Sequence, residues 1–329
     1  MFTSHASGAQ GPSGGGTSPP SYAPSGLGPE LNFLGLPTEL SDPRTAPAVV
    51  LSVPFERTSS FGRGSAGGPA AILEASRQME LFDAAFECEP AVAFGGIATL
   101  PPLEFSDSAT GEQVSGALED QVASLLEHEK FVVTLGGEHT SVVGAIRACA
   151  RRFSELTVLQ LDAHADLRPA YEGDAWSHAC AMARVLDVPC KLVQVGIRSQ
   201  EKGEWERARR DKIPILYASQ IVRPGGAASD WVERVLAHCT GQVYVTLDCD
   251  CLDPAIMPTV GTPEPGGLDW YDTLALVAAV TRGRELVGLD VSELAPVPGL
   301  HGPPFTAAKF IYRTLSHRFL APTGERTTG

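Results

Sequence analysis

The chain has 329 residues, of which 43% are hydrophobic and 19% charged, enough apolar content to bury a large core in one or two globular domains. Its formal net charge of -14 argues against general nucleic-acid binding, which needs clustered Lys and Arg, and weakly favours a cationic substrate. No stretch approaches the roughly 20 apolar residues of a membrane span, and the N-terminus lacks a signal-peptide pattern. We therefore expect a soluble, cytoplasmic protein with no membrane partner.

Residues 1–30 are rich in Gly, Ser and Pro, contain no Lys or Arg, and offer only scattered apolar side chains. Such a composition cannot offset the entropy lost on ordering the chain. We predict a disordered tail over residues 1–30, followed by a single catalytic domain over residues 31–329.

Beyond the tail, short apolar runs alternate with segments of helical character. The alternation, with strands apolar on both faces, predicts an α/β fold in which helices cover a buried, mostly parallel sheet of about eight strands. The expected strands are 48–54, 91–94, 131–135, 157–161, 192–196, 213–216, 243–247 and 286–289. The expected helices include 69–82, 112–128, 140–153, 178–185, 231–238 and 270–280.

Seven cysteines, an odd number without a CxxC pair, indicate free thiols in a reducing compartment. Cys249 and Cys251 alternate with two aspartates, so we expect them on the opposite side of that strand as small buried hydrophobes rather than metal ligands.

Side chains able to bind metal follow three of the expected strands. They are His139, then Asp162, His164 and Asp166, then Asp248 and Asp250. In open parallel sheets, ligands bind outside the carboxyl ends of the strands, which is where all three groups fall. A single DxD is often a plain loop and a lone histidine is usually structural, but two such strand ends plus a histidine loop form a strong joint signal.

The spacing of these residues predicts a two-metal site. On an extended chain alternate side chains share a face, which would bring Asp162, His164 and Asp166 together, and likewise Asp248 with Asp250. Four clustered carboxylates repel one another, whereas two divalent ions would balance their charge while both histidines stay neutral. An oxygen-rich site with few imidazoles and no thiolate suits Mn²⁺ better than zinc or copper.

A glycine-rich stretch, Gly62 to Gly67, matches the dinucleotide-binding pattern GxGxxG and precedes an expected helix. It does not follow its strand directly, and the acidic residues further along fall in or just after a helix rather than ending a second strand. We therefore reject a nucleotide site there.

Taken together, these segments resemble the signature blocks of the ureohydrolases, the manganese enzymes that include agmatinases and arginases. The supporting blocks are 177–179, 261–267 and 288–293, and the resemblance runs in order from about residue 48 to 315. It implies a three-layer α/β/α, arginase-like fold, hydrolysis of a guanidino group to urea, and a trimeric or hexameric homo-oligomer.

The resemblance also implies the division of the ligands between two Mn²⁺ ions. One ion would be held by His139, Asp162, Asp166 and Asp248, and the other by Asp162, His164, Asp248 and Asp250. Two ions sharing a water would lower its pKa and supply a hydroxide for attack on the guanidinium carbon.

Three residues are candidates for the catalytic steps. Asp166 could hydrogen-bond the nucleophile and the tetrahedral intermediate. His178 is the candidate proton donor to the leaving amine, because imidazole titrates near neutral pH. Glu293 is the candidate for holding the guanidinium in a bidentate pair. Without the resemblance, His178 could equally be a helix-start residue, and Glu293 a solvated charge.

The blocks are closest to the agmatinase branch, which implies cleavage of agmatine to putrescine and urea, a step of polyamine biosynthesis. Arginases carry an asparagine at the position of Arg168, so arginine is a less favoured substrate. Aminopropylagmatine stays open, as does a guanidino acid if Arg168 turns inward. A non-catalytic, metal-binding regulatory relative is the alternative from another class, although no ligand or proton donor is missing.

Overall fold

The computed structural model describes residues 24–222 and 230–320. Residues 24–30, the end of the predicted tail, belong to this part, and the Leu27 amide donates a hydrogen bond to the Thr99 carbonyl at 2.7 Å. The rest of the predicted tail lies outside the described residues. No helix in the described ranges is long and apolar enough to cross a membrane.

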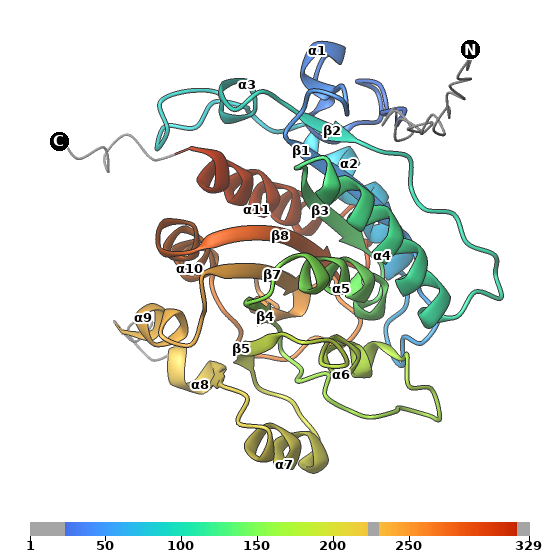
Figure 1. The fold of residues 1–329 in the computed structure, drawn as a ribbon, viewed down its shortest axis with the longest axis vertical. Coiled ribbons are helices and arrows are strands. Elements are labelled where there is room, and N and C mark those ends of the chain that lie inside the picture. Colours follow the sequence, from blue (N-terminus) through green and yellow to red (C-terminus); the bar gives the residue numbers. More distant parts are fainter. Residues whose placement is uncertain (1–23, 223–229, 321–329) are drawn as a thin grey trace, which may run out of the picture.

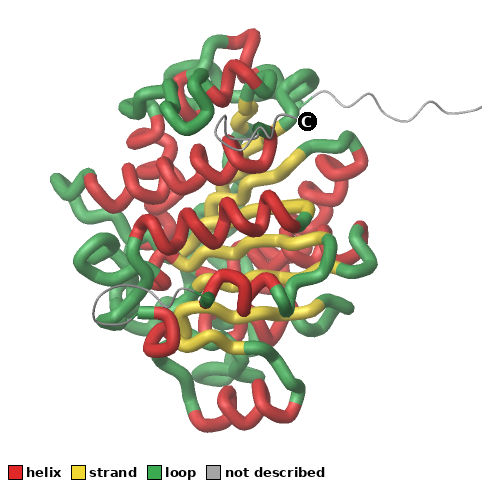
Figure 2. Tube along the Cα trace, turned by 90° about the vertical axis from the view of Figure 1, so that its left-hand side faces the viewer, coloured by secondary structure: helices red, strands yellow, loops and turns green. Residues whose placement is uncertain are grey.

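Eight parallel strands form one sheet at the centre of the molecule (Figures 1 and 2). Their spatial order is β2-β1-β3-β8-β7-β4-β5-β6, so β1 to β3 form one half, β4 to β6 extend outward in the other, and β7 and β8 return to lie between β4 and β3. The strands are β1 (Ala48–Val53), β2 (Ile97–Thr99), β3 (Phe131–Gly136), β4 (Leu156–Leu161), β5 (Lys191–Ile197), β6 (Ile215–Tyr217), β7 (Gln242–Asp248) and β8 (Glu285–Ser292).

Helices cover both faces of the sheet, and each face has its own hydrophobic core. One core joins the sheet to α2, α9, α10 and α11, and the other joins it to α4, α5, α6 and α7. This arrangement confirms the predicted three-layer fold. The helices are α1 (Thr38–Ser41), α2 (Gly68–Ser76), α3 (Pro90–Ala93), α4 (Gly111–Glu127), α5 (Val143–Arg152), α6 (Ala181–Val185), α7 (Lys202–Arg210), α8 (Ala218–Ile221), α9 (Trp231–Leu236), α10 (Trp270–Gly283) and α11 (Gly302–Phe319), with short 3₁₀ turns η1 (Phe33–Gly35), η2 (Ser65–Gly67), η3 (His139–Val142), η4 (His178–Cys180) and η5 (Cys249–Cys251).

Local sequence explains these elements. Every residue of β1, β3 and β4 is buried, as expected for strands covered on both faces. Helix α4 begins with a capping box, in which Thr110 and Gln113 each satisfy the other's free backbone amide.

One predicted strand is wrong. Residues 91–94 lie in and just after helix α3, and the second strand is β2, a few residues later. An apolar run of four residues has no periodicity that separates a strand from a buried helical turn. Pro90, whose fixed φ suits the first turn of a helix, was the signal for the helical outcome.

The strand order brings the site together. Strands β3, β8, β7 and β4 are consecutive in the centre of the sheet. Because all four run parallel, their carboxyl ends meet at one edge, and this edge carries His139, Glu293, Asp248 and Asp162 respectively.

Candidate active site

The six predicted ligands converge, but not along extended strands. Strand β4 ends at Leu161 and β7 ends at Asp248, so Asp162, His164, Asp166 and Asp250 lie in the turns that follow. The predicted alternation along a strand is therefore wrong as the reason for convergence. Cys249 and Cys251 are buried as predicted, but in the 3₁₀ turn η5 rather than on the opposite side of a strand.

His139 is the centre of the first group of ligands. Its Nδ1 atom lies 2.9 Å from Asp166 Oδ2, 3.2 Å from Asp162 Oδ2 and 3.5 Å from Asp248 Oδ2. All four residues are buried. One imidazole nitrogen therefore faces three carboxylate oxygens, two from the turn after β4 and one from the end of β7.

His164 is the centre of the second group. Its Nδ1 atom lies 2.9 Å from Asp250 Oδ2 and 3.7 Å from Asp162 Oδ1. Asp162 belongs to both groups, each of which brings its ligand atoms within 4.8 Å of one another. Its two oxygens face different histidines, as a carboxylate that bridges two ions would require.

Burial and mutual repulsion make Asp162 and Asp248 hard to ionise without a cation. Burial would also raise the pKa of Asp250, but the neighbouring His164 lowers it to about 2. Burial, and then Asp250 and Asp166, raise the pKa of Asp162 to about 7. Burial and the neighbouring Asp250 raise the pKa of Asp248 well above its usual range. Burial alone would lower the pKa of His164, but Asp250 and Asp162 raise it to about 10.

The donor set fits two hard divalent ions. It consists of four carboxylates and two imidazoles, with no thiolate among the converging atoms. Divalent ions would replace the protons that the carboxyl groups otherwise retain and would restore the neutral form of both histidines.

Two backbone features hold the turns in place. Asp166 and Glu293 both have positive φ angles, 51° and 64°, a left-handed conformation that costs energy for residues other than glycine. Gly137 precedes the His139 loop so closely packed that a Cβ atom there would lie 2.1 Å from the Phe55 carbonyl oxygen. The site therefore contains two strained residues and one closely packed glycine.

Glu293 lies directly after β8 and is 8% exposed. Its Oε1 accepts a hydrogen bond from the His139 backbone amide at 2.6 Å. The residue also lines the same cavity as the predicted ligands, so part of the carboxylate remains available to a bound molecule.

His178 lies across the cavity from the sheet edge, in turn η4. Its Nδ1 lies 3.2 Å from Thr58 Oγ1, and its Nε2 lies 3.4 Å from Ser60 Oγ. Burial lowers the pKa of His178, which keeps the ring largely neutral at pH 7. A neutral imidazole between two hydroxyl groups can accept a proton from one side and deliver it on the other.

The loop that carries Thr58 and Ser60 is held in place by Glu138, the neighbour of the predicted ligand His139. The buried carboxylate of Glu138 accepts hydrogen bonds from the backbone amides of Arg57, Thr58 and Ser59 through one oxygen, at 2.6 to 3.1 Å. The glycine-rich stretch that follows this loop packs against Gly261, next to the cavity residue Thr262, and thus lies beside the site.

The cavity over these residues has a volume of about 330 Å³. Its outer wall is formed by Arg168, Tyr171, Glu201 and Glu204. The Arg168 guanidinium lies 4.8 Å from the centre of the Tyr171 ring, and its Nε is 3.7 Å from both glutamate carboxylates. Two glutamates therefore lie beside Arg168 and offset its positive charge in the cavity wall.

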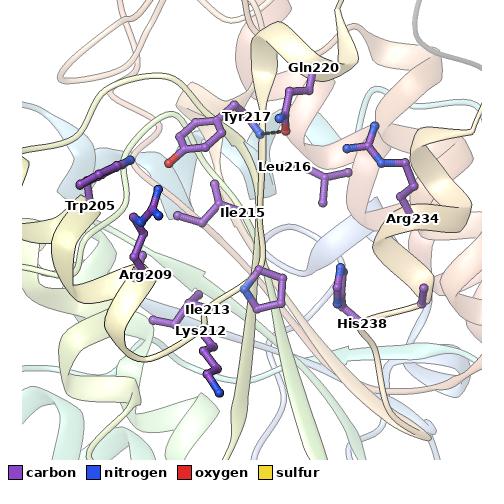
Figure 3. A pocket seen from close by; sticks show the side chains of 13 residues that line it. Trp205, Arg209, Lys212, Ile213, Ile215, Leu216, Tyr217, Gln220, Arg234 and His238 are labelled. Carbon is purple, nitrogen blue, oxygen red and sulfur yellow. Dashed lines mark hydrogen bonds between the residues drawn. The ribbon is translucent and has the colours of Figure 1, made fainter.

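A larger groove, about 600 Å³, follows the edge strand β6 elsewhere on the molecule (Figure 3). Trp205 and Arg209 lie on one flank of this strand, and Arg234 and His238 on the other. No acidic side chain is among the described residues that line it, and Arg209, Lys212 and Arg234 give it positive charge, which disfavours a divalent ion. The smaller cavity is the one with the means for metal chemistry.

Several residues of the site were missed from sequence. Glu201 and Glu204 belong to the beginning of α7, a highly charged helix without an apolar stripe. The available signal was the capping box that these two glutamates form, three residues apart. Thr58, Ser60 and Glu138 gave no such signal, because single Ser, Thr or Glu residues in loops are common.

Comparisons with known proteins agree with this site. The Arginase family model matches residues 46–316. The chain is 37% identical over 277 residues to N(1)-aminopropylagmatine ureohydrolase of Synechocystis sp., covering 83% of this chain and 89% of the relative. It is 33% identical over 272 residues to agmatinase of Bacillus cereus, covering 81% and 90%.

The solved structure of agmatine ureohydrolase of Thermoplasma volcanium superimposes with a TM-score of 0.76 at 30% identity, over 85% of this chain and 92% of that one. The family match covers both strand ends with the aspartates, the His139 loop and the segment that ends in Glu293. The chain belongs to the arginase family and is a ureohydrolase.

Proposed function

We propose that this ureohydrolase uses two Mn²⁺ ions to release urea from agmatine, or from agmatine extended by an aminopropyl group. The proposed class of substrate rests on the ion pairs that Arg168 makes. Its guanidinium is shared between Glu201 and Glu204, so the outer wall of the cavity keeps an excess of negative charge. A positively charged amine tail is favoured there, whereas the carboxylate of arginine or of a guanidino acid is repelled.

The agmatinase of Bacillus cereus supports agmatine as the first candidate. The second candidate, N(1)-aminopropylagmatine, is favoured by Glu201, whose side chain is 57% exposed at the rim. This carboxylate lies at the rim, where the one added ammonium group of aminopropylagmatine could meet it. The Synechocystis relative carries the name of this activity.

The side chains divide the work of hydrolysis. Two bound ions supply Lewis acidity and an activated water. Glu293 accepts hydrogen bonds from the guanidinium N–H groups and holds the reacting carbon over the carboxylate cluster. Asp166, fixed by its strained backbone, accepts a hydrogen bond from the attacking group. His178, neutral at the start, takes up the proton that the attacking water releases and delivers it to the amine nitrogen as the C–N bond breaks, and Thr58 and Ser60 keep its ring in position.

A panel of guanidino compounds tests this proposal. We expect the manganese-loaded protein to release urea from agmatine and aminopropylagmatine with kcat/KM values at least about 100-fold above those for arginine and 4-guanidinobutyrate, since charge repulsion at the wall is of the order of several kcal/mol. Release of urea from none of the four compounds would reject the proposed substrates. A preference for 4-guanidinobutyrate would show that Arg168 does receive a carboxylate.

The variant Glu201→Gln, assayed with the same panel, separates the two polyamine candidates. We expect it to raise KM for aminopropylagmatine more than KM for agmatine, with kcat little changed, because Glu201 lies at the rim and away from the reacting carbon. Equal changes for both compounds would remove Glu201 as the contact for the longer tail.

A further inference from the structure

Two buried polar residues, Thr246 and Asp290, lie in sequence on the Nε2 side of the His139 ring. Its Nδ1 faces the carboxylates of the site, while its Nε2, on the far side of the ring, lies 3.0 Å from Thr246 Oγ1. Thr246 in turn donates a hydrogen bond to Asp290 Oδ1 at 2.8 Å. Thr246 and Asp290 are fully buried and face each other in the register of β7 and β8. Neither residue lines the cavity.

The direction of these hydrogen bonds follows from counting hydrogens. In its ionised form, which bound cations nearby would favour, Asp290 has no hydrogen to donate, so its bond with Thr246 uses the single hydroxyl hydrogen of Thr246. Thr246 Oγ1 then has only lone pairs left for His139, and the Nε2 atom must carry the hydrogen. The neutral ring therefore presents a free lone pair at Nδ1, the atom that faces the carboxylates.

We propose that Asp290 and Thr246 are positioning residues, which fix the tautomer and the ring orientation of His139 so that Nδ1 is ready to bind a metal ion. The inference rests on the proposed metal function of the site. An imidazole ligand whose second nitrogen donates to an oriented acceptor loses less freedom on binding and is a better electron-pair donor. We call this chain of hydrogen bonds from His139 through Thr246 to Asp290 the relay. It takes up no space in the cavity, because it lies entirely inside the sheet.

The two histidines differ in this respect. The His164 side chain is 25% exposed, and its Nδ1 pairs with Asp250. Within residues 24–222 and 230–320, no hydroxyl and carboxylate pair supports its other nitrogen. The relay should therefore affect the ion bound by His139 and leave the ion bound by His164 largely unchanged.

Titration of the metal-free protein with MnCl₂, followed by calorimetry and by elemental analysis after dialysis, tests this inference. Thr246→Val keeps the shape of the side chain and removes the acceptor. Asp290→Asn can offer an N–H to Thr246, which would turn the hydroxyl toward His139 and favour the wrong tautomer. Thr246→Ser keeps the hydroxyl group and should therefore retain both hydrogen bonds. Thr134→Val is the matched control, since Thr134 is a buried neighbour of Asp290 on β3 whose hydroxyl has no hydrogen-bond partner in the described chain.

We expect Thr246→Val and Asp290→Asn to weaken one of two manganese sites by roughly 10- to 100-fold, the usual effect of losing the partner of a ligating histidine. Thr246→Ser and Thr134→Val should bind both ions with affinities close to wild type. Wild-type affinity at both sites in Thr246→Val or in Asp290→Asn would overturn the inference. If one of these two variants does not fold, as judged by thermal unfolding without metal, the metal affinity of the other variant tests the inference.

This outcome is distinct from failure of the proposed function. If the wild-type protein binds two Mn²⁺ ions and all four variants bind them equally well, the relay is rejected and the metal site stands. If the wild-type protein binds no Mn²⁺ and releases no urea, the proposed function itself is rejected.

Discussion

Asp162 joins the two halves of the site. Its two oxygens face His139 and His164 separately, and the residue is completely buried. A carboxylate in that position cannot be neutralised by solvent, and a single histidine cannot serve both oxygens. The buried carboxylate is stabilised only if a positive charge lies beside each of its oxygens, as two ions bridged by Asp162 would provide.

His178 differs from the ligands in having hydroxyl groups rather than carboxylates as its neighbours. Thr58 and Ser60 hold opposite nitrogens of its ring, and burial favours the neutral form. We propose that a histidine in this setting moves protons without binding metal. Its position across the cavity from the sheet is therefore as informative as the residue type.

At the scale of elements, the bend between β3 and η3 depends on Gly137. We expect Gly137→Ala to lower the free energy of unfolding by about 1–3 kcal/mol, because the added Cβ would lie 2.1 Å from the Phe55 carbonyl oxygen and force the backbone apart. The displaced loop carries Glu138 and His139, so metal affinity should fall as well. Chemical denaturation and metal titration measure the two effects.

Gly203→Ala provides the control for this substitution. Gly203 lies in α7, and a Cβ there would meet no atom within 4 Å. Alanine in a helix should leave stability unchanged or raise it by roughly 0.5–1 kcal/mol. If Gly137→Ala were as stable as Gly203→Ala, the close packing at the bend would not be what shapes the loop.

Most elements could be predicted from sequence because buried strands and capped helices have strong local patterns. The predicted strands 131–135 and 157–161 lie within β3 and β4, and 112–128 matches α4 within a residue at each end. Two elements differed for physical reasons. The run at 91–94 was too short to show a period, and α7 is a charged helix at the edge of the sheet, where no apolar stripe is needed.

The convergence of the predicted site residues could be expected from sequence, but their geometry could not. The residues at the strand ends were correctly brought to one edge, because parallel strands fix where their carboxyl ends lie. The turn conformations were not predictable, since a positive φ at an aspartate such as Asp166 leaves no mark in the sequence. The pairing of Arg168 with Glu201 also required contacts between segments more than thirty residues apart.

At the scale of the whole molecule, the buried carboxyl groups link stability to pH. Burial raises the pKa values of Asp162 and Asp290 from 3.8 to about 7, so the folded metal-free protein binds more protons than the unfolded chain between these values. The free energy of unfolding must then decrease as pH rises, and this contribution is lost above about pH 7. The raised pKa of His164, about 10, extends the loss from pH 6.5 upward.

Thermal unfolding between pH 5 and 8, with and without Mn²⁺, measures this linkage. The metal-free protein should lose stability across this range. Metal binding displaces the same protons, so the stabilisation produced by added Mn²⁺ should grow with pH. A metal-free protein whose stability rose steadily from pH 5 to 8 would show that these groups are already ionised in the folded state.

The central claim is that one sheet edge binds two metal ions and that a separate histidine completes the chemistry. Elemental analysis of purified wild-type, His164→Ala and His178→Ala proteins, each also assayed for urea release, tests it most directly. We expect two Mn²⁺ ions per chain in the wild type and one in His164→Ala. His178→Ala should keep two ions but lose turnover by about 10²- to 10⁴-fold. A wild type with fewer than two ions, a His164→Ala protein that keeps both, or near-normal turnover in His178→Ala would contradict it.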